Sequence, residues 1–179
     1  MKHNIQKILI SEEEIQNRIS QLAQEVSQDY AGKNPVFVGV LKGVLVFMGD
    51  FMQKVTIPCE MDLMRIASYE GTGSTGNIRM LMDLSTDIRG RHVVILEDIF
   101  DTGRSLDYTY RYLLGKKPAS VKIVTLLDKP ERRLPGVELK ADYTGFVIPN
   151  EFVVGYGMDY NEYYRNLPFI GVLKPEVYM

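Results

Sequence analysis

The sequence predicts an α/β fold in which a parallel, twisted β-sheet is flanked by helices. Short apolar segments alternate with segments of helical periodicity along the chain. The apolar segments are continuous, as is typical of parallel strands that are buried on both faces. The chain has 179 residues, 45% of them hydrophobic, with no repeat or linker that would divide it. A single domain of this size buries a core without disulfides.

The first predicted helix begins after Ser11. Ser11 and Glu14 have the Ser-x-x-Glu spacing of a capping box. Apolar residues then recur at helical spacing, and Gly32 is the expected stop. A short buried strand is predicted over residues 36–41, followed by a helix over 44–53.

The rest of the chain continues this alternation. We expect a mobile loop over residues 68–77, which contain three glycines and little to bury. A helix is predicted over 105–114, where apolar residues share one face and Gly115 follows. The predicted strands are 61–65, 78–82, 92–97, 121–127 and 146–148.

Composition narrows the class of protein. The net charge is −2, whereas a nucleic-acid-binding protein usually carries a basic excess, so nucleic acid is not the expected partner. The first residues contain no long apolar stretch, and no apolar run approaches the ~20 residues of a membrane span. We therefore expect a cytoplasmic protein.

Cys59 is the single cysteine and cannot form an intramolecular disulfide, and we interpret it as a small packed residue.

Loops of unusual composition leave the carboxyl ends of three predicted strands. They are residues 41–43, 97–105 and 128–129. In open α/β sheets ligands bind beyond the carboxyl ends of the strands. The three loops therefore predict one active site.

The segment 97–105, EDIFDTGRS, carries the strongest chemical signal. Small and hydroxylated residues around Gly103, followed by a helix N-terminus, would form a cradle for a phosphate. Glu97 and Asp98 would repel a phosphate, so they need ribose hydroxyls or a divalent cation such as Mg²⁺ as partners. The plain alternative is an acidic strand end before an N-capped helix. A Walker lysine is absent, which excludes a P-loop NTPase.

The string VVILEDIFDTGRSL, residues 93–106, resembles the phosphoribosyl-pyrophosphate motif of type I phosphoribosyltransferases. Residues 41–43, 68–69, 126–129 and 152–165 are similar, in the right order, to the hypoxanthine-guanine branch of that family. The resemblance implies the type I fold over residues 1–179. In that fold the sheet carries a small hood, formed by the N-terminal segment and about residues 150–179.

The resemblance also implies an activity: transfer of the 5-phosphoribosyl group from phosphoribosyl pyrophosphate to N9 of hypoxanthine or guanine, with Mg²⁺ as cofactor. Asp101 would be the catalytic residue, accepting the purine N7 proton. The implied phosphoribosyl- and 5′-phosphate-binding residues are Glu97, Asp98, Asp101, Thr102, Gly103, Arg104 and Ser105.

The remaining roles also follow from the resemblance. Lys42, Gly43 and Arg165 would bind pyrophosphate, and the 41–42 peptide is often cis in this family. Lys129 donates hydrogen bonds and accepts none, which would favour a 6-oxo group over a 6-amino group. The implied purine-binding residues are Lys129, Phe152, Val153 and Asp159; the implied metal residues are Glu97, Asp98 and Asp159; the implied lid begins at Ser68 and Tyr69.

Several questions stay open at this stage. One alternative is an enzyme that prefers xanthine or accepts all three 6-oxopurines. The other is a regulator that binds nucleotides to control transcription or RNA. Against the regulator, the sequence has no appended helix-turn-helix signature and no basic arm. Family members commonly form dimers or tetramers, and the helix near Phe47 and Met48 is a candidate interface or plain core. Phe100 replaces an expected smaller aliphatic residue, and we expect it to face the covering layer of the sheet.

Overall fold

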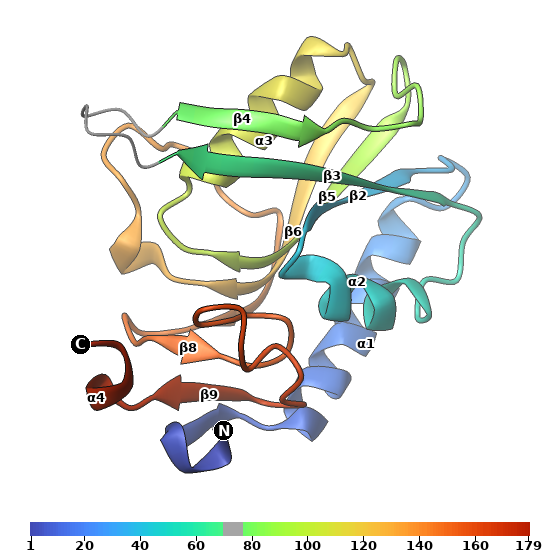
Figure 1. Ribbon diagram of the computed structural model, residues 1–179. Coiled ribbons are helices and arrows are strands. Elements are labelled where there is room, and N and C mark those ends of the chain that lie inside the picture. The colour runs from blue at the N-terminus through green and yellow to red at the C-terminus, as the bar shows by residue number, and fades with distance from the viewer. Residues whose placement is uncertain (70–76) are drawn as a thin grey trace.

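The computed structural model describes residues 1–69 and 77–179, in which helices cover both faces of a six-stranded sheet and a smaller sheet lies beside it (Figure 1). This confirms the predicted fold class. The strands of the larger sheet, in spatial order, are β4 (Asn77–Met82), β3 (Glu60–Tyr69), β2 (Val36–Leu41), β5 (His92–Phe100), β6 (Ser120–Asp128) and β7 (Tyr143–Val147).

Strand pairing in the larger sheet is parallel from β3 to β7 and antiparallel between β3 and β4. The prediction of a parallel sheet is therefore right for five strands and wrong for the edge strand β4. An antiparallel edge strand on a parallel sheet is common in α/β proteins. Because β2, β5 and β6 run side by side and in one direction, their carboxyl ends meet at one edge of the sheet.

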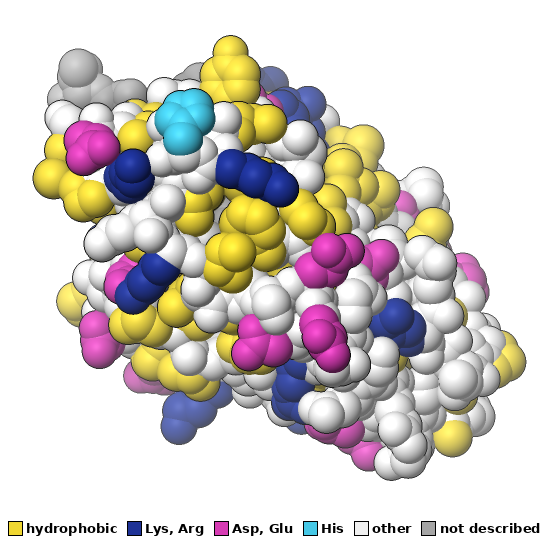
Figure 2. Space-filling model, turned by 90° about the horizontal axis from the view of Figure 1, so that it is seen from below, with side chains coloured by type: hydrophobic (Ala, Val, Ile, Leu, Met, Phe, Trp, Pro, Cys, Tyr) yellow, Lys and Arg dark blue, Asp and Glu magenta, His cyan; other side chains and the backbone are white. Residues whose placement is uncertain are grey.

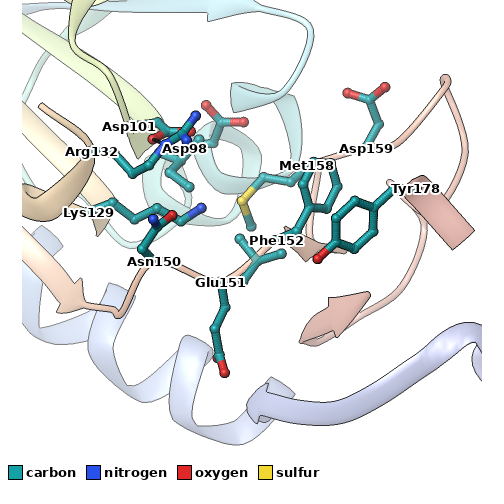
Figure 3. A pocket seen from close by; sticks show the side chains of 12 residues that line it. Asp98, Asp101, Lys129, Arg132, Asn150, Glu151, Phe152, Met158, Asp159 and Tyr178 are labelled. Carbon is teal, nitrogen blue, oxygen red and sulfur yellow. Dashed lines mark hydrogen bonds and ion pairs between the residues drawn. The ribbon is translucent and has the colours of Figure 1, made fainter. Parts of the chain in front are cut away.

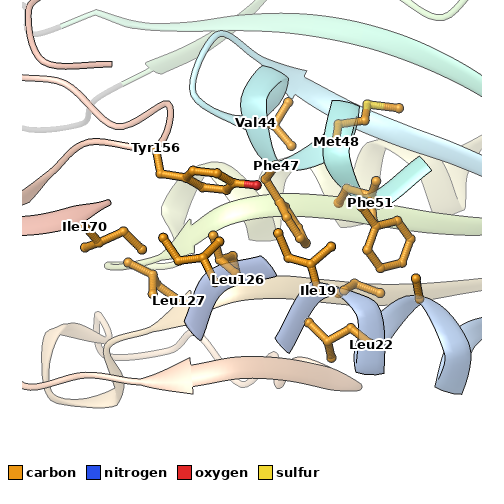
Figure 4. Close-up of a cluster of buried hydrophobic side chains, with 14 of the residues drawn as sticks. Ile19, Leu22, Val44, Phe47, Met48, Phe51, Leu126, Leu127, Tyr156 and Ile170 are labelled. Atoms are coloured by element: carbon orange, nitrogen blue, oxygen red, sulfur yellow. The ribbon is translucent and has the colours of Figure 1, made fainter. Parts of the chain in front are cut away.

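Alternate residues of β5 enter two separate cores. Val94 and Leu96 pack with helices α1 (Glu12–Asp29) and α2 (Val44–Met52), as Figure 4 shows for the side chains of that core. Val93 and Ile95 pack on the opposite face, against α3 (Arg104–Gly115). Successive side chains of a strand point to opposite faces, so a continuous apolar strand is what a sheet covered on both sides requires.

The first helix forms as its capping signal predicts. The Ser11 side chain accepts a hydrogen bond from the Glu14 amide, and the Glu14 carboxylate accepts one from the Ser11 amide at 2.8 Å. In α2, Phe47 and Met48 are buried in the core, which supports the plain core interpretation for these two residues. Leu45 and Val46 are the exposed apolar side chains of that helix.

The smaller sheet joins the two ends of the chain. Strand β1 (Ile5–Ile10) pairs antiparallel with β9 (Ile170–Leu173), which pairs with β8 (Val153–Val154). We call this sheet, together with residues 150–179, the hood. It includes the short C-terminal helix α4 (Pro175–Tyr178). Tyr156 and Ile170 extend into the core beneath α2, so the hood packs directly on the larger unit (Figure 4).

Several element boundaries differ from the sequence-based predictions. The strand expected over 146–148 covers Tyr143–Val147, and the one expected over 92–97 continues to Phe100. Strands β1, β8 and β9 and the 3-10 helices η1 (Lys2–Asn4) and η2 (Pro130–Arg132) were not predicted. The hood strands were not predicted because strands of two to six residues leave little periodicity to recognise, and β1 pairs with a strand at the other end of the chain.

Figure 2 shows the underside of the molecule, where hydrophobic side chains gather on the part that the hood occupies. On the remainder of that face, acidic, basic and other polar side chains stand among fewer hydrophobic ones. Among residues 1–69 and 77–179, no helix is long and apolar enough to cross a membrane.

Candidate active site

A cavity of about 410 Å³ opens between the carboxyl ends of β5 and β6 and the hood. Of the residues that the sequence analysis singled out, Asp98, Asp101, Lys129, Phe152, Val153 and Asp159 line it. Figure 3 shows the Lys129 side chain extending into the space that Asp101 and Phe152 also face. Residues from three distant parts of the sequence are thus brought to one cavity, at the sheet edge that the strand order predicts.

The loop between β5 and α3 places Asp101, Thr102 and Gly103 directly before the helix. Gly103 has a φ of +84°, and a Cβ built on it would lie 2.7 Å from a Val137 methyl carbon and 2.9 Å from the Phe100 ring. Only glycine therefore allows this close turn. Arg104 and Ser105 begin α3, and the positive end of its dipole lies at this loop.

Glu97 and Asp98 are half-buried at the end of β5. Burial and the neighbouring carboxylate of Asp98 raise the pKa of Glu97 well above its usual range. Burial also raises the pKa of Asp98, although hydrogen bonds from the backbone and the charge of Arg165 oppose the rise. Two adjacent carboxyl groups that are partly withdrawn from water would be stabilised by a cation.

Gly43 lies against Asp98 at the end of β2. A Cβ on Gly43 would lie 1.9 Å from Asp98 Oδ2, so this position tolerates only glycine without rearrangement. The peptide bond between Leu41 and Lys42 is cis. The Lys42 ammonium lies 2.8 Å from a carboxylate oxygen of Glu162.

Arg165 joins the hood to this cluster. Its Nη1 donates to the Gly157 carbonyl at 2.7 Å, and its Nη2 lies 2.8 Å from Asp159 Oδ1. Its Nε is buried and has no hydrogen-bond partner among the described residues. Gly157 in turn lies against Gly43, the residue that follows Lys42 after β2, since a Cβ on Gly157 would lie 2.1 Å from the Gly43 carbonyl oxygen. Arg165 therefore keeps one unsatisfied donor while it binds Gly157, the residue that lies against Gly43.

Lys129 and Phe152 supply the cationic and aromatic walls of the cavity. Lys129 follows β6 and is 5% exposed, and burial lowers the pKa of its ammonium group. Phe152 is 38% exposed and lies just before β8. Its ring stacks on Tyr178, with centroids 4.6 Å apart and planes 19° apart. A buried amine opposite an aromatic ring suits a flat polar ligand that has an acceptor on its edge.

Asp101 is held by the segment that follows β6. Its Oδ1 accepts a hydrogen bond from Arg132 Nε at 3.1 Å, and its carbonyl accepts one from Arg133. Phe100 is buried on the α3 side of the sheet with Arg133 over its ring, which confirms that it faces the covering layer.

Sequence reasoning missed part of the cavity wall. Glu151 turns its carboxylate away from the other labelled side chains (Figure 3), toward Lys7, 2.7 Å away. Tyr178 gave no signal because its contact with Phe152 depends on where the C-terminal helix folds back. The missed lining residues are Ile99, Arg132, Asn150, Glu151, Met158 and Tyr178. Of these, Ile99, Glu151 and Met158 stand inside the recognised motifs or directly beside them.

Ser68, Tyr69 and Cys59 are the remaining residues that the sequence analysis singled out. Ser68 and Tyr69 have β3 backbone pairing, while the rest of the predicted lid, residues 70–76, lies outside the described residues. Cys59 packs against the core, and burial raises the pKa of its thiol, which argues against a nucleophile.

The chain belongs to the phosphoribosyltransferase family: the profile described as "Phosphoribosyl transferase domain" matches residues 8–161. Within that family its relatives are those of the hypoxanthine-guanine branch, which confirms the resemblance drawn from the motifs. The hypoxanthine-guanine phosphoribosyltransferase of Streptococcus pneumoniae R6 is 51% identical over 99% of this chain and 98% of its own length. The Bacillus subtilis 168 protein of the same name is 49% identical over the same shares.

The chain is also similar to part of a longer protein and to a solved structure. The bifunctional protein TilS/HprT of Listeria monocytogenes F2365 is 52% identical over 99% of this chain, and the chain spans 27% of that protein's length. A crystal structure of a Staphylococcus aureus hypoxanthine phosphoribosyltransferase matches with a TM-score of 0.95 and 46% identity, covering all of this chain and 97% of the other.

Proposed function

We propose that this protein transfers the 5-phosphoribosyl group of phosphoribosyl pyrophosphate to N9 of hypoxanthine or guanine. The products would be IMP or GMP and pyrophosphate, a reaction of purine salvage. The observation that carries the proposal is the meeting of Asp101, Lys129 and Phe152 in one cavity beside the loop that resembles the family's donor motif. Relatives of matching length at about 50% identity support the same activity.

The donor would bind along the sheet edge. The 5′-phosphate would lie at residues 101–105, where Gly103 permits the turn and the α3 dipole favours an anion. Ribose hydroxyls would be held by Glu97 and Asp98. Arg165 and the Lys42-Gly43 peptide would receive the pyrophosphate group, and the unpartnered Nε of Arg165 supports that assignment.

The base would lie between Phe152 and the β5 loop. Because an ammonium group only donates, Lys129 would pair with the O6 acceptor of hypoxanthine or guanine. The 6-amino group of adenine would meet a second donor there, and such a mismatch in a buried site discriminates strongly. The backbone at Val153 and the side chain of Asp159 would then lie beside the C2 edge of the base.

Asp101 would act as the general base. As N9 attacks C1′, the bond from C1′ to the pyrophosphate oxygen breaks and positive charge passes to the purine. A carboxylate within hydrogen-bond reach of N7 would accept the proton and remove that charge.

Mg²⁺ fits the acidic residues at the site. Within the described residues, no group of three or more histidine, cysteine or acidic side chains forms a ready metal cage. Mg²⁺ usually binds through one or two carboxylates together with substrate oxygens, and the adjacent pair Glu97 and Asp98, whose pKa values burial raises, meets that description. These residues, with Asp159, would hold the ion, which would neutralise charge on the leaving pyrophosphate.

Assembly and location are part of the same proposal. We propose a homodimer or homotetramer in the cytoplasm, with the exposed Leu45 and Val46 of α2 as candidate contact residues. Light scattering after size-exclusion chromatography tests the assembly. A monomer at micromolar concentration contradicts it.

A panel of bases tests the activity. Pyrophosphate release is measured with phosphoribosyl pyrophosphate, Mg²⁺ and, separately, hypoxanthine, guanine, xanthine and adenine. We expect turnover with hypoxanthine and guanine and none with adenine. A kcat/KM for xanthine above both others contradicts the base assignment. Tight RNA or DNA binding without pyrophosphate release contradicts the enzyme.

A further inference from the structure

Arg132 makes an ion pair with the carboxylate proposed as the general base. Its Nε lies 3.1 Å from Asp101 Oδ1, and both residues line the cavity (Figure 3). Arg132 ends the 3-10 helix η2, outside every motif that carries the family resemblance. No role follows for it from those motifs.

The segment that carries Arg132 is fastened to the catalytic loop at several points. Arg133 Nη1 donates to the Phe100 carbonyl at 3.0 Å and also to the Asp101 carbonyl, while its Nη2 pairs with Asp128. The Leu134 amide donates to the Thr102 carbonyl at 3.0 Å. The backbone on both sides of the ion pair is therefore held by hydrogen bonds, and this fixes the position from which the Arg132 side chain reaches Asp101.

The ion pair is too exposed to contribute much to folding. The Arg132 and Asp101 side chains are 47% and 35% exposed, and such pairs typically contribute about 0–1 kcal/mol. Its effect on geometry is a separate matter. A carboxylate rotates about its side-chain bonds, and a donor on one oxygen restricts the direction in which the other oxygen accepts.

We propose that Arg132 is a positioning residue for the proton transfer. It holds Asp101 Oδ1 and leaves Oδ2 free to accept the N7 proton of the purine. In the same way, the third residue of a catalytic triad orients the residue that acts as general base. The inference rests on the proposed function.

In the step itself, the N9–C1′ bond forms, the C1′–O bond breaks with its electron pair leaving on pyrophosphate, and the N7 proton passes to Asp101. Arg132 neither gains nor loses a proton.

Two variants distinguish the effect of the Arg132 charge from the effect of the shape of its side chain. R132M removes the donors and keeps the chain length, and R132K keeps a cation with one nitrogen. We expect R132M to lower kcat by about 10-fold, which is less than the ~10²–10⁴-fold that general-base catalysis contributes, because Asp101 itself remains. The KM for phosphoribosyl pyrophosphate should stay within about twofold. R132K should recover part of the loss in kcat.

A double-mutant cycle with D101N tests whether Arg132 acts through Asp101. Asparagine cannot accept the proton, so adding R132M to D101N should change kcat by less than about twofold. An equal loss of kcat in both backgrounds overturns the proposal. A raised KM with unchanged kcat also overturns it, because Arg132 would then bind substrate directly.

The matched control is R91M. Arg91 makes a similar ion pair, 2.7 Å from Glu60, at the opposite end of the strands. Its kcat should equal that of the unmodified chain, and a similar loss in R91M and R132M overturns the proposal. If the unmodified chain releases no pyrophosphate with any 6-oxopurine, the proposed function itself fails, which the base panel detects independently. If R132M does not fold, R132Q removes the positive charge with a polar side chain, and R132Q with R132Q/D101N gives the cycle in its place.

Discussion

The loop of residues 97–105 carries its chemistry in nine consecutive residues, whereas the hood assembles its part of the cavity from both ends of the chain. In the loop, the strand end, the turn at Gly103 and the helix start place each group by local geometry. In the hood, Phe152 is positioned by Tyr160 at 5.7 Å and by Tyr178 at 4.6 Å, both ring-centroid distances. Val153 is held by pairing with Val172.

This difference indicates how each region responds to substitution. The loop is chemically dense and accepts hydrogen bonds from Arg133 and Leu134 at its backbone carbonyls, so changes there should alter the reaction itself. The hood acts through packing, so changes there should alter the affinity for the base. Asp101→Ala in the loop and Tyr178→Ala in the hood test this division directly, and substitutions of Gly43 and Lys129, which lie outside both regions, extend the test.

The largest effect is expected for Asp101→Ala in the loop. Removal of a general base lowers kcat by about 10²–10⁴-fold, while the affinity for phosphoribosyl pyrophosphate should be nearly unchanged. Steady-state kinetics and calorimetric titration of the donor measure the two quantities. A collapse of donor binding with normal turnover at saturation would make Asp101 a binding residue.

The next effect concerns the contact between Gly43 and Asp98. Gly43→Ala places a methyl group where Asp98 Oδ2 now lies, 1.9 Å from the built Cβ. A displacement of about 1 Å can cost about 10²-fold in rate, so kcat/KM for phosphoribosyl pyrophosphate should fall to that extent. Gly49→Ala in α2, where nothing lies within 4 Å of the built Cβ, is the control and should keep full activity.

Lys129→Met should weaken base binding and stabilise the fold. The lost charged hydrogen bond corresponds to about 1.5–3 kcal/mol, or about 10- to 150-fold in kcat/KM for hypoxanthine. Burial lowers the pKa of the Lys129 ammonium, so the unfolded chain binds its proton more tightly than the native chain. The charge therefore destabilises the native state at neutral pH.

The pH dependence of stability checks the sign of this effect. As pH rises through the lowered pKa of Lys129 toward the ordinary value of about 10.4, the native protein should gain stability relative to Lys129→Met. The advantage of the variant in denaturant unfolding, about 0.5–2 kcal/mol at pH 7, should shrink over that range. A variant less stable than the native protein at pH 7 contradicts the prediction.

The smallest effect is expected for Tyr178→Ala in the hood. A stacked aromatic pair contributes about 0.5–1.5 kcal/mol, so the KM for hypoxanthine should rise about 2- to 12-fold. The KM for phosphoribosyl pyrophosphate and kcat should not change. Tyr178→Phe keeps the ring and should behave like the native protein. A comparable rise in the donor KM would mean that the hood also organises the loop.

The fold class was predictable because its signals are local. The capping box at Ser11, the continuous apolar run of β5 and the glycine at position 103 each report their own backbone conformation. The hood was not predictable from residue patterns, because β1 and β9 acquire their strand character by pairing across 160 or more residues. The resemblance to a known family supplied the hood where periodicity could not.

The sequence by itself predicted residues 93–106 as the donor-binding segment and determined which chemical groups Asp101, Lys129, Phe152 and Arg165 offer to the proposed site. The tertiary structure alone decided the contacts that these segments make with one another and with residues outside the motifs. It places the Gly43 loop against Asp98, Tyr178 behind Phe152 and Arg132 on Asp101. Local conformation depends on neighbouring residues, which a sequence displays directly. Contacts between distant segments depend on how the sheet and hood pack, and that packing is set by the whole chain at once.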